Sequence, residues 1–168
     1  TRISFGANGH YDPESKYLIY EADEFDRNFL NFHPDASVIP SVDYDHPDIY
    51  PSTKEYKQAF SDFVSQSGRT YLWQETKEYL ALANCESIRI ANSEMEPGDL
   101  ELPGEMSRRN ATLSVHLIED VFDKSQPEIL FALRSYPGTE RRMERIARNV
   151  ISDYAHHPVE IRSTLQAA

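Results

Sequence analysis

Two acidic stretches decide the fold of this chain: YEADEFDRNF at residues 20–29 and SVDYDHPDIY at residues 41–50. Each follows a short apolar run, residues 17–20 in the first case and residues 36–39 in the second. Both runs have the length and composition of buried strands. Because ligands of an open parallel sheet bind beyond the carboxyl ends of its strands, we expect the two acidic stretches to contribute to one site.

The polar side chains in these stretches have the chemistry of a metal site. Carboxylate oxygens suit Mg²⁺, which keeps several waters and usually binds through one or two protein ligands together with substrate phosphates. An imidazole beside carboxylates can bind a metal or orient a carboxylate ligand. An acidic cluster after a strand can equally be a solvated cap, so each stretch alone leaves both interpretations open. The candidate metal ligands are Glu21 and His46.

Composition excludes several classes of function. The chain has 168 residues, 39% hydrophobic and 11% aromatic, which is enough for a core. Its 17 Lys and Arg against 28 Asp and Glu give a net charge of −11, which argues against a nucleic-acid or anionic-membrane partner. The single cysteine, Cys85, excludes an internal disulfide and suits a reducing compartment. The chain contains no run of 18 apolar residues and no signal-peptide pattern, so we expect neither a membrane span nor a leader.

Periodicity and turn residues predict alternating strands and helices after the second stretch. Tyr56, Phe60, Phe63 and Val64 recur at helical spacing and predict an amphipathic helix that Gly68 ends. Further strands are expected at residues 70–73, 87–91 and 99–102, and further helices at residues 76–83, 110–122 and 128–134. This order is typical of an α/β domain with a mainly parallel sheet.

A change in sequence character at residue 136 predicts a domain boundary. A Pro-Gly turn at residues 136–139 is followed by four arginines, of which the pair Arg141 and Arg142 comes first. Arginine forks match phosphate oxygens, although a solvated basic helix start is the other interpretation. Beyond it, a strand at residues 150–152 and a helix opening at Pro158 predict the start of a second α/β domain.

The end of that last strand carries a third polar cluster, Asp153-Tyr154-Ala155-His156-His157. It precedes a helix N-terminus, which favours anions. By itself, a histidine pair at this position indicates either a turn or a binding site.

Taken together, five stretches resemble the Mur ligase family, in the family's order and at its approximate spacing: YEADEFD, VDYDHPDIY, LPGEMSRRN, PGTERRMERI and ISDYAHHPVEI. The resemblance covers nearly the whole chain. It implies that residues 1–135 are the C-terminal part of a P-loop-type central ATP-binding domain. Residues 136–168 would be the hinge and the first strand and helix of a Rossmann-like C-terminal domain. The family's phosphate loop is expected before Thr1, so we expect a piece of a longer protein that is inactive alone.

The resemblance also implies an activity. Mur ligases of this kind use ATP and Mg²⁺ to phosphorylate the carboxylate of UDP-N-acetylmuramate, and the amine of L-alanine then attacks the acyl phosphate. This implies a cytoplasmic enzyme of peptidoglycan synthesis. Tyr154 favours the alanine-adding type, since the peptide-recycling relative tends to have Phe there. That recycling ligase, a folylpolyglutamate-synthase-like ligase and a non-catalytic nucleotide- or metal-binding module remain alternatives.

The family's functional residues carry over position by position. Glu21 and His46 match a metal-site glutamate and histidine, Asn110 an adenine-contacting asparagine, and Arg142 a hinge arginine near the phosphates. Asp153, Tyr154 and His156 match residues that close over ATP and the incoming amino acid. The candidate catalytic residues are therefore His46, Asp153 and His156, and the candidate substrate-binding residues are Tyr154 and His157. Where the family usually has Gly-x-His-Asn, this chain has Gly104-Glu105-Met106-Ser107.

Overall fold

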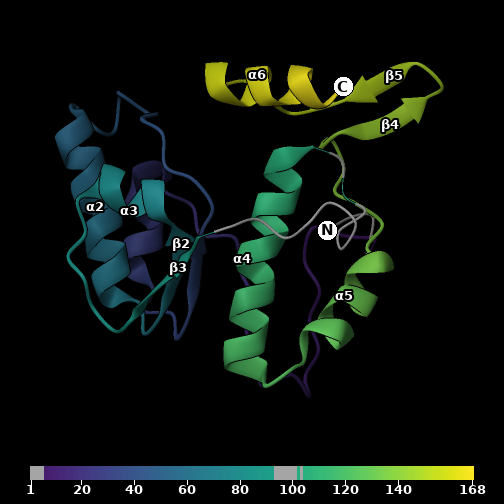
Figure 1. Ribbon diagram of the computed structural model, residues 1–168. Helices are drawn as coiled ribbons and strands as arrows, with labels where there is room; N and C mark the ends of the chain where they lie inside the picture. The colour runs from purple at the N-terminus through teal and green to yellow at the C-terminus, as the bar shows by residue number, and fades with distance from the viewer. Residues whose placement is uncertain (1–5, 93–101, 103) are drawn as a thin grey trace. The chain divides into compact units, whose positions relative to one another are not determined.

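The computed structural model describes residues 6–92, 102 and 104–168 (Figure 1). Contacts divide the chain into two compact units. The first, here called the sheet unit, consists of the described residues of Ile19–Glu94 and Thr112–Ser125. The second, here called the hairpin unit, consists of the described residues of Thr1–Leu18, Met95–Ala111 and Gln126–Ala168. The helix α4 (Glu105–Phe122) begins in the hairpin unit and ends in the sheet unit.

A three-stranded parallel sheet forms the centre of the sheet unit, in the order β1 (Ser37–Ile39), β2 (Thr70–Trp73) and β3 (Ile88–Ala91). All four residues of the middle strand β2 are buried. A parallel strand that is covered on both faces shows a continuous apolar run instead of alternation, which explains the sequence TYLW. The predicted α/β fold with a parallel sheet is confirmed.

The two faces of β2 pack against different elements. Leu72 joins a cluster with residues of the 3-10 helix η1 (Phe25–Asn31) and of α2 (Thr53–Gln66), including Phe29 and Phe63. Tyr71 and Trp73 instead pack with Leu113 of α4. The sheet is therefore covered by α2 and η1 on one face and by the second part of α4 on the other.

The predicted helices form with small shifts at their ends. The side chain of Ser52 accepts a hydrogen bond from the Glu55 backbone at 3.3 Å and so caps the start of α2. A Cβ atom at Gly68 would lie 2.7 Å from the Asp35 carbonyl oxygen, so this turn requires glycine. Helix α3 spans Gln74–Leu80, α4 begins five residues earlier than predicted, and α5 spans Gln126–Arg134.

A polar contact ties the end of α4 to the sheet. The hydroxyl of Tyr71 donates to Asp120 Oδ2 at 3.0 Å, and Arg89 Nε lies 3.4 Å from the same oxygen. Burial and the hydrogen bond to Asp120 raise the pKa of Tyr71, so the hydroxyl stays protonated and keeps donating. These contacts fix how far along the sheet the last turn of α4 lies.

The strand predicted at residues 17–20 is wrong. This segment forms neither a helix nor a strand and pairs with no strand of the described residues, and the side chains of Leu18 and Ile19 are 82% and 88% exposed. An apolar run forms a strand only where a neighbouring strand satisfies its backbone, which composition alone does not reveal. The strand predicted at residues 99–102 lies outside the described residues apart from Leu102.

The hairpin unit contains an antiparallel pair, β4 (Glu144–Ala147) and β5 (Val150–Ser152), followed by α6 (Pro158–Ala167). The strand at residues 150–152 and the helix at Pro158 are confirmed. The interpretation of the arginine-rich segment as a helix start is wrong, because β4 pairs with β5 there. Within the described residues, no helix is long and apolar enough to cross a membrane.

Two leucine-to-alanine variants test the double coverage of β2. Leu72 has no exposed surface, so Leu72→Ala leaves a cavity in the core and is expected to cost about 2–5 kcal/mol in the free energy of unfolding. The matched variant Leu18→Ala removes an exposed side chain and is expected to change stability by less than about 0.5 kcal/mol. Urea unfolding measures both, and equal losses would contradict the packing described.

Candidate functional site

A buried tyrosine joins the two acidic stretches. Tyr50 has no exposed surface, and its hydroxyl donates to the carbonyl oxygen of Glu24 at 2.5 Å. Tyr44 in turn donates through its hydroxyl to the Tyr50 carbonyl at 2.7 Å. Burial raises the pKa of Tyr50, which keeps its hydroxyl protonated as a donor. The stretches therefore meet because the end of the second is anchored in the core.

His46 is held at this junction by backbone and side-chain contacts. Its backbone is left-handed, with φ +56°, and its carbonyl accepts hydrogen bonds from the backbone of Ile49 and Tyr50, both at 2.9 Å. Its Nε2 atom lies 3.5 Å from Glu24 Oε1 and 3.8 Å from Asp45 Oδ2. The imidazole is thus placed among carboxylates, as the sequence predicted.

The carboxylate beside His46 belongs to Glu24, whereas the sequence pointed to Glu21. Glu21 is exposed and lines a hollow of about 360 Å³ together with Ala22, Asp23 and Glu24. Glu24 therefore belongs both to this hollow and to the surroundings of His46. Sequence reasoning missed its role, although its place in the same acidic stretch made it available as a candidate.

The donors in this region fit Mg²⁺ in type but do not form a closed cage. No group of three or more His, Cys, Asp or Glu side chains among the described residues is arranged to hold a metal ion. Mg²⁺ does not require such a group, because it commonly keeps waters and takes phosphate oxygens alongside one or two carboxylates. The exposed Glu21 carboxylate and the partly buried His46 ring match that open kind of site.

In the hairpin unit, Asp153 is committed to hydrogen bonds with its own fold. Its Oδ2 accepts from the Met143 backbone at 2.8 Å, and its Oδ1 accepts from the Ala155 backbone at 2.8 Å and from Thr164 Oγ1 at 3.0 Å. Burial alone would raise the pKa of Asp153, but these hydrogen bonds and the charge of Arg142 together lower it. In this structure Asp153 positions the turn, and its predicted catalytic role stays a prediction.

The two predicted histidines meet a carboxylate at the start of α6. His157 is the N-cap residue, and Glu160 completes a capping box with it. Glu160 Oε2 accepts hydrogen bonds from the backbone of His156 at 3.2 Å and of His157 at 3.4 Å. The same oxygen lies 3.6 Å from His156 Nδ1, and Oε1 lies 4.0 Å from Arg142 Nη1. Sequence reasoning missed Glu160, although a glutamate three residues after a cap is the usual capping-box spacing.

The remaining predicted residues are exposed. Tyr154 donates its backbone N–H to the Arg141 carbonyl at 2.8 Å, and the Arg141 guanidinium lies 5.0 Å from the centre of the Tyr154 ring. Asn110 presents an exposed side chain on α4. Glu21 and His46 both belong to the sheet unit, but no contact joins them among the described residues. The hairpin unit contains the other predicted residues: Asn110, Arg142, Asp153, Tyr154, His156 and His157.

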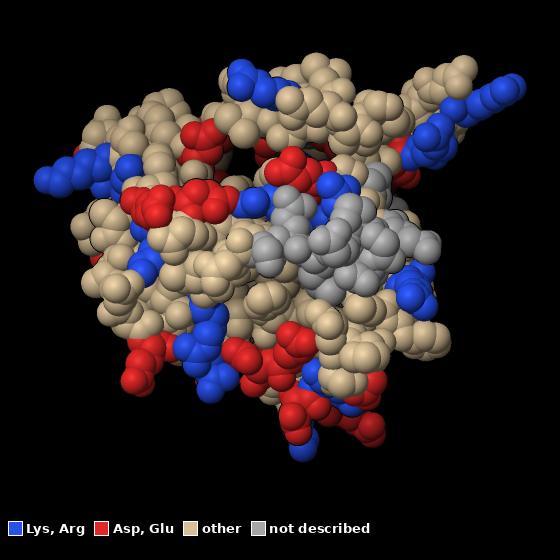
Figure 2. Space-filling model, viewed as in Figure 1, with Lys and Arg blue, Asp and Glu red and all other residues tan. Residues whose placement is uncertain are grey.

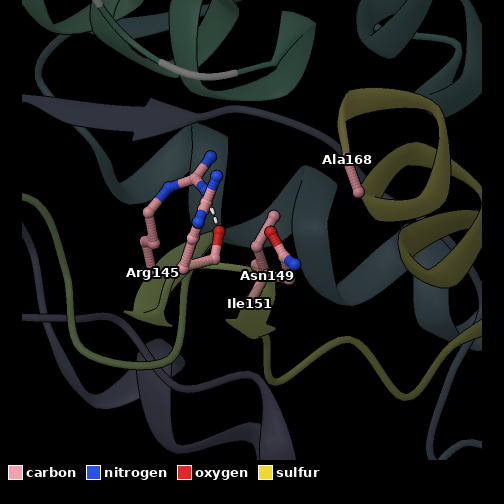
Figure 3. Close-up of a pocket in the computed structure, with 5 residues that line it drawn as sticks. Arg145, Asn149, Ile151 and Ala168 are labelled. Carbon is pink, nitrogen blue, oxygen red and sulfur yellow. Dashed lines mark hydrogen bonds between the residues drawn. The ribbon is translucent and has the colours of Figure 1, made fainter.

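A second hollow lies on the β4–β5 hairpin. It has a volume of about 370 Å³ and is lined by Arg145, Arg148, Asn149, Ile151 and Ala168 (Figure 3). Arg145 Nη1 donates to the Arg148 carbonyl at 2.9 Å, so the first guanidinium is bound to the hairpin itself. On the face shown in Figure 2, acidic and basic side chains are interspersed.

Comparison with known proteins finds similar chains of one kind. No family model matches the chain. A UDP-N-acetylmuramate–L-alanine ligase of Streptococcus equi subsp. zooepidemicus is 27% identical over 191 residues, which cover 95% of this chain and 43% of the relative. The ligase of the same name from Desulfitobacterium hafniense is 28% identical over 200 residues, which cover 98% of this chain and 44% of that relative. The crystal structure of the UDP-N-acetylmuramate–alanine ligase from Thermotoga maritima matches with a TM-score of 0.70 and 25% identity, over 88% of this chain and 41% of that one.

These similarities confirm the resemblance to the Mur ligases that the five motifs predicted. Within that family, the curated relatives are named UDP-N-acetylmuramate–L-alanine ligase, and the chain is their homologue over nearly its whole length. The chain spans about 43% of the length of the first of these relatives.

Replacing Tyr50 tests the junction of the acidic stretches. Tyr50→Phe removes the hydroxyl that donates to the Glu24 carbonyl while keeping the ring in the core. We expect a loss of about 1 kcal/mol in the free energy of unfolding, the usual net contribution of one hydrogen bond. Tyr11→Phe, at an exposed tyrosine, is the control and should leave stability unchanged. A Tyr50→Phe protein as stable as the parent would contradict the anchoring role.

The lowered pKa of Asp153 predicts a pH-dependent contribution to stability. Because the folded pKa lies below the unfolded value of about 3.9, the ionised carboxylate stabilises the fold above that pH, and this contribution is lost as pH falls through the folded pKa. We expect Asp153→Asn to be less stable than the parent at pH 7, with the difference shrinking toward pH 3. Urea unfolding across this range measures it. Asp48→Asn, at an exposed carboxylate, is the control, and a difference that does not vary with pH would refute the assignment.

Proposed function

We propose that the protein carrying this chain is an ATP-dependent ligase that joins L-alanine to UDP-N-acetylmuramate in peptidoglycan synthesis. The observation that supports this most strongly is similarity over 95% of the chain to relatives of that name. The contacts of His46 with Glu24 and of Arg142 and His156 with Glu160 also support it. ATP and the nucleotide sugar are cytoplasmic substrates, so we propose a cytoplasmic enzyme.

The chemistry requires that two anions react. The carboxylate of UDP-N-acetylmuramate attacks the γ-phosphorus of ATP, ADP leaves, and an acyl phosphate forms. The amine of L-alanine then attacks the acyl carbon and inorganic phosphate departs, which leaves an amide bond. Negative charge on the transferred phosphoryl group must be neutralised in the first step, because attacker and target repel each other.

The sheet unit would supply the metal side of that neutralisation. Glu21 and His46 would hold Mg²⁺, which when bound offsets phosphate charge. Glu24 lies 3.5 Å from His46 Nε2, so it orients the imidazole. The burial of Tyr50 holds this arrangement in place, since its hydroxyl fixes the Glu24 backbone.

The hairpin unit would supply the residues that close over ATP and the amino acid. The Arg142 guanidinium offers a fork that suits phosphate oxygens. Arg142 and His156 both lie close to the Glu160 carboxylate, at 4.0 Å and 3.6 Å. Tyr154 and His157 would contact the incoming alanine, with Asp153 holding the turn that carries them. Asn110 on α4 would contact adenine.

The proposed division of the chain follows from these roles. Residues 1–135 would form the latter part of the central ATP-binding domain. Residues 136–168 would form the hinge and the first strand and helix of a Rossmann-like C-terminal domain.

Ligation by the full-length protein tests the proposal. Purified protein is mixed with UDP-N-acetylmuramate, L-alanine, ATP and Mg²⁺, and the alanyl product is measured by mass spectrometry. We expect Glu21→Gln and His46→Ala to lower kcat at least about 100-fold, because each removes a ligand that neutralises phosphate charge. Glu14→Gln, at an exposed glutamate outside the motif stretches, is the charge-matched control.

The outcomes separate the alternatives. Product with a preformed peptide but none with free L-alanine would indicate the recycling ligase. Glutamate addition to a folate would indicate a folylpolyglutamate-synthase-like ligase. Nucleotide binding without any product would indicate a non-catalytic module, and unchanged turnover in Glu21→Gln or His46→Ala would remove that residue from the site.

A further inference from the structure

Glu160 contacts two residues that the motifs place near the phosphates and the amino acid. Its Oε1 lies 4.0 Å from Nη1 of Arg142, which precedes β4, and its Oε2 lies 3.6 Å from Nδ1 of His156, which follows β5. One carboxylate on the first turn of α6 therefore links both sides of the β4–β5 hairpin. None of the motif roles carried over from the family uses this residue.

The two carboxylate oxygens of Glu160 have different partners. Oε2 accepts the backbone hydrogen bonds of His156 and His157, which satisfy donors at the start of α6. Oε1 faces Arg142 alone among the contacts described, at a distance longer than a good hydrogen bond. The cap is thus an ordinary helix feature, whereas Oε1 places a negative charge beside Arg142.

We propose that Glu160 is a positioning residue that holds Arg142 and His156 together until phosphate oxygens replace its Oε1 as the partner of Arg142. This inference rests on the proposed function, because it takes Arg142 as a phosphate-binding residue. The Arg142 side chain is 53% exposed and that of Glu160 is 40% exposed, and an ion pair this exposed contributes little to stability. It can be exchanged at low cost for a bidentate, charge-assisted pair with phosphate, which is stronger.

A purely structural role for Glu160 makes a different prediction. Glutamine serves at this position of a capping box as well as glutamate does, because its amide oxygen accepts the same backbone hydrogen bonds. Glu160→Gln therefore keeps the cap and removes only the charge that attracts Arg142 and His156. If Glu160 were only a cap, Glu160→Gln would bind nucleotide as the parent does.

The experiment measures the dissociation constant of Mg-ATP for the full-length protein by titration calorimetry, together with the melting temperature. We expect Glu160→Gln to weaken Mg-ATP binding about three-fold, within the roughly 0.2–1 kcal/mol that so exposed a pair is worth, with an unchanged melting temperature. Glu140→Gln changes the same charge at an exposed position near the hinge and should bind as the parent does. Unchanged affinity in Glu160→Gln, or an equal loss in Glu140→Gln, would overturn the proposal.

A double variant tests whether Glu160 acts through Arg142. If it does, Arg142→Ala/Glu160→Gln binds Mg-ATP no more weakly than Arg142→Ala alone, because the partner is already absent. Losses that multiply would overturn the proposal. If the two substitutions are non-additive but the protein forms no product with L-alanine, only the proposed function is contradicted. If the protein ligates L-alanine but the two effects are additive, only the role of Glu160 is contradicted.

Discussion

Strand β2 presents Leu72 to one face of the sheet and Tyr71 and Trp73 to the other, and all three side chains are buried. Full burial of side chains of this size is worth roughly 1.5–3 kcal/mol each, so an uncovered face would forfeit several kcal/mol. The sheet unit is stable only if α2 and the second part of α4 cover β2 together. The contacts of Asp120 with Tyr71 and Arg89 then fix the last turn of α4 against the strands.

The site in the sheet unit inherits its geometry from that core. The chain leaves β1 at Ile39, passes the acidic stretch and returns to the core at Tyr50, whose ring packs in the same cluster as Leu72. His46 lies on the short turn just before that return, and its carbonyl is bonded to the Tyr50 backbone. The position of the imidazole therefore follows from the burial of a tyrosine four residues away.

The sequence predicted the structural features that depend on neighbouring residues in the chain, and it failed for those that depend on distant residues. Helix α2 was predicted because the spacing of Tyr56, Phe60 and Phe63 is a local signal that acts within a few residues. The exposed run around Leu18 was mistaken for a strand, since strand formation requires a neighbour that composition does not reveal. Likewise, the choice of Glu24 over Glu21 as the partner of His46 is made by the long-range bond from Tyr50.

The carboxylates of the hairpin unit bear on the phosphate site proposed there. Asp153 accepts three hydrogen bonds from its own fold, so its negative charge is stabilised by local donors. Glu160 commits one oxygen to the cap of α6 and leaves the other with Arg142. The net charge of −11 therefore does not describe the local charge around Arg142, because the nearby carboxylates of Asp153 and Glu160 are paired with backbone donors and cations. In the proposed exchange, a phosphate that displaced Oε1 of Glu160 would meet the exposed Arg142 guanidinium, and His156 Nδ1 would remain 3.6 Å from Oε2 of the same carboxylate.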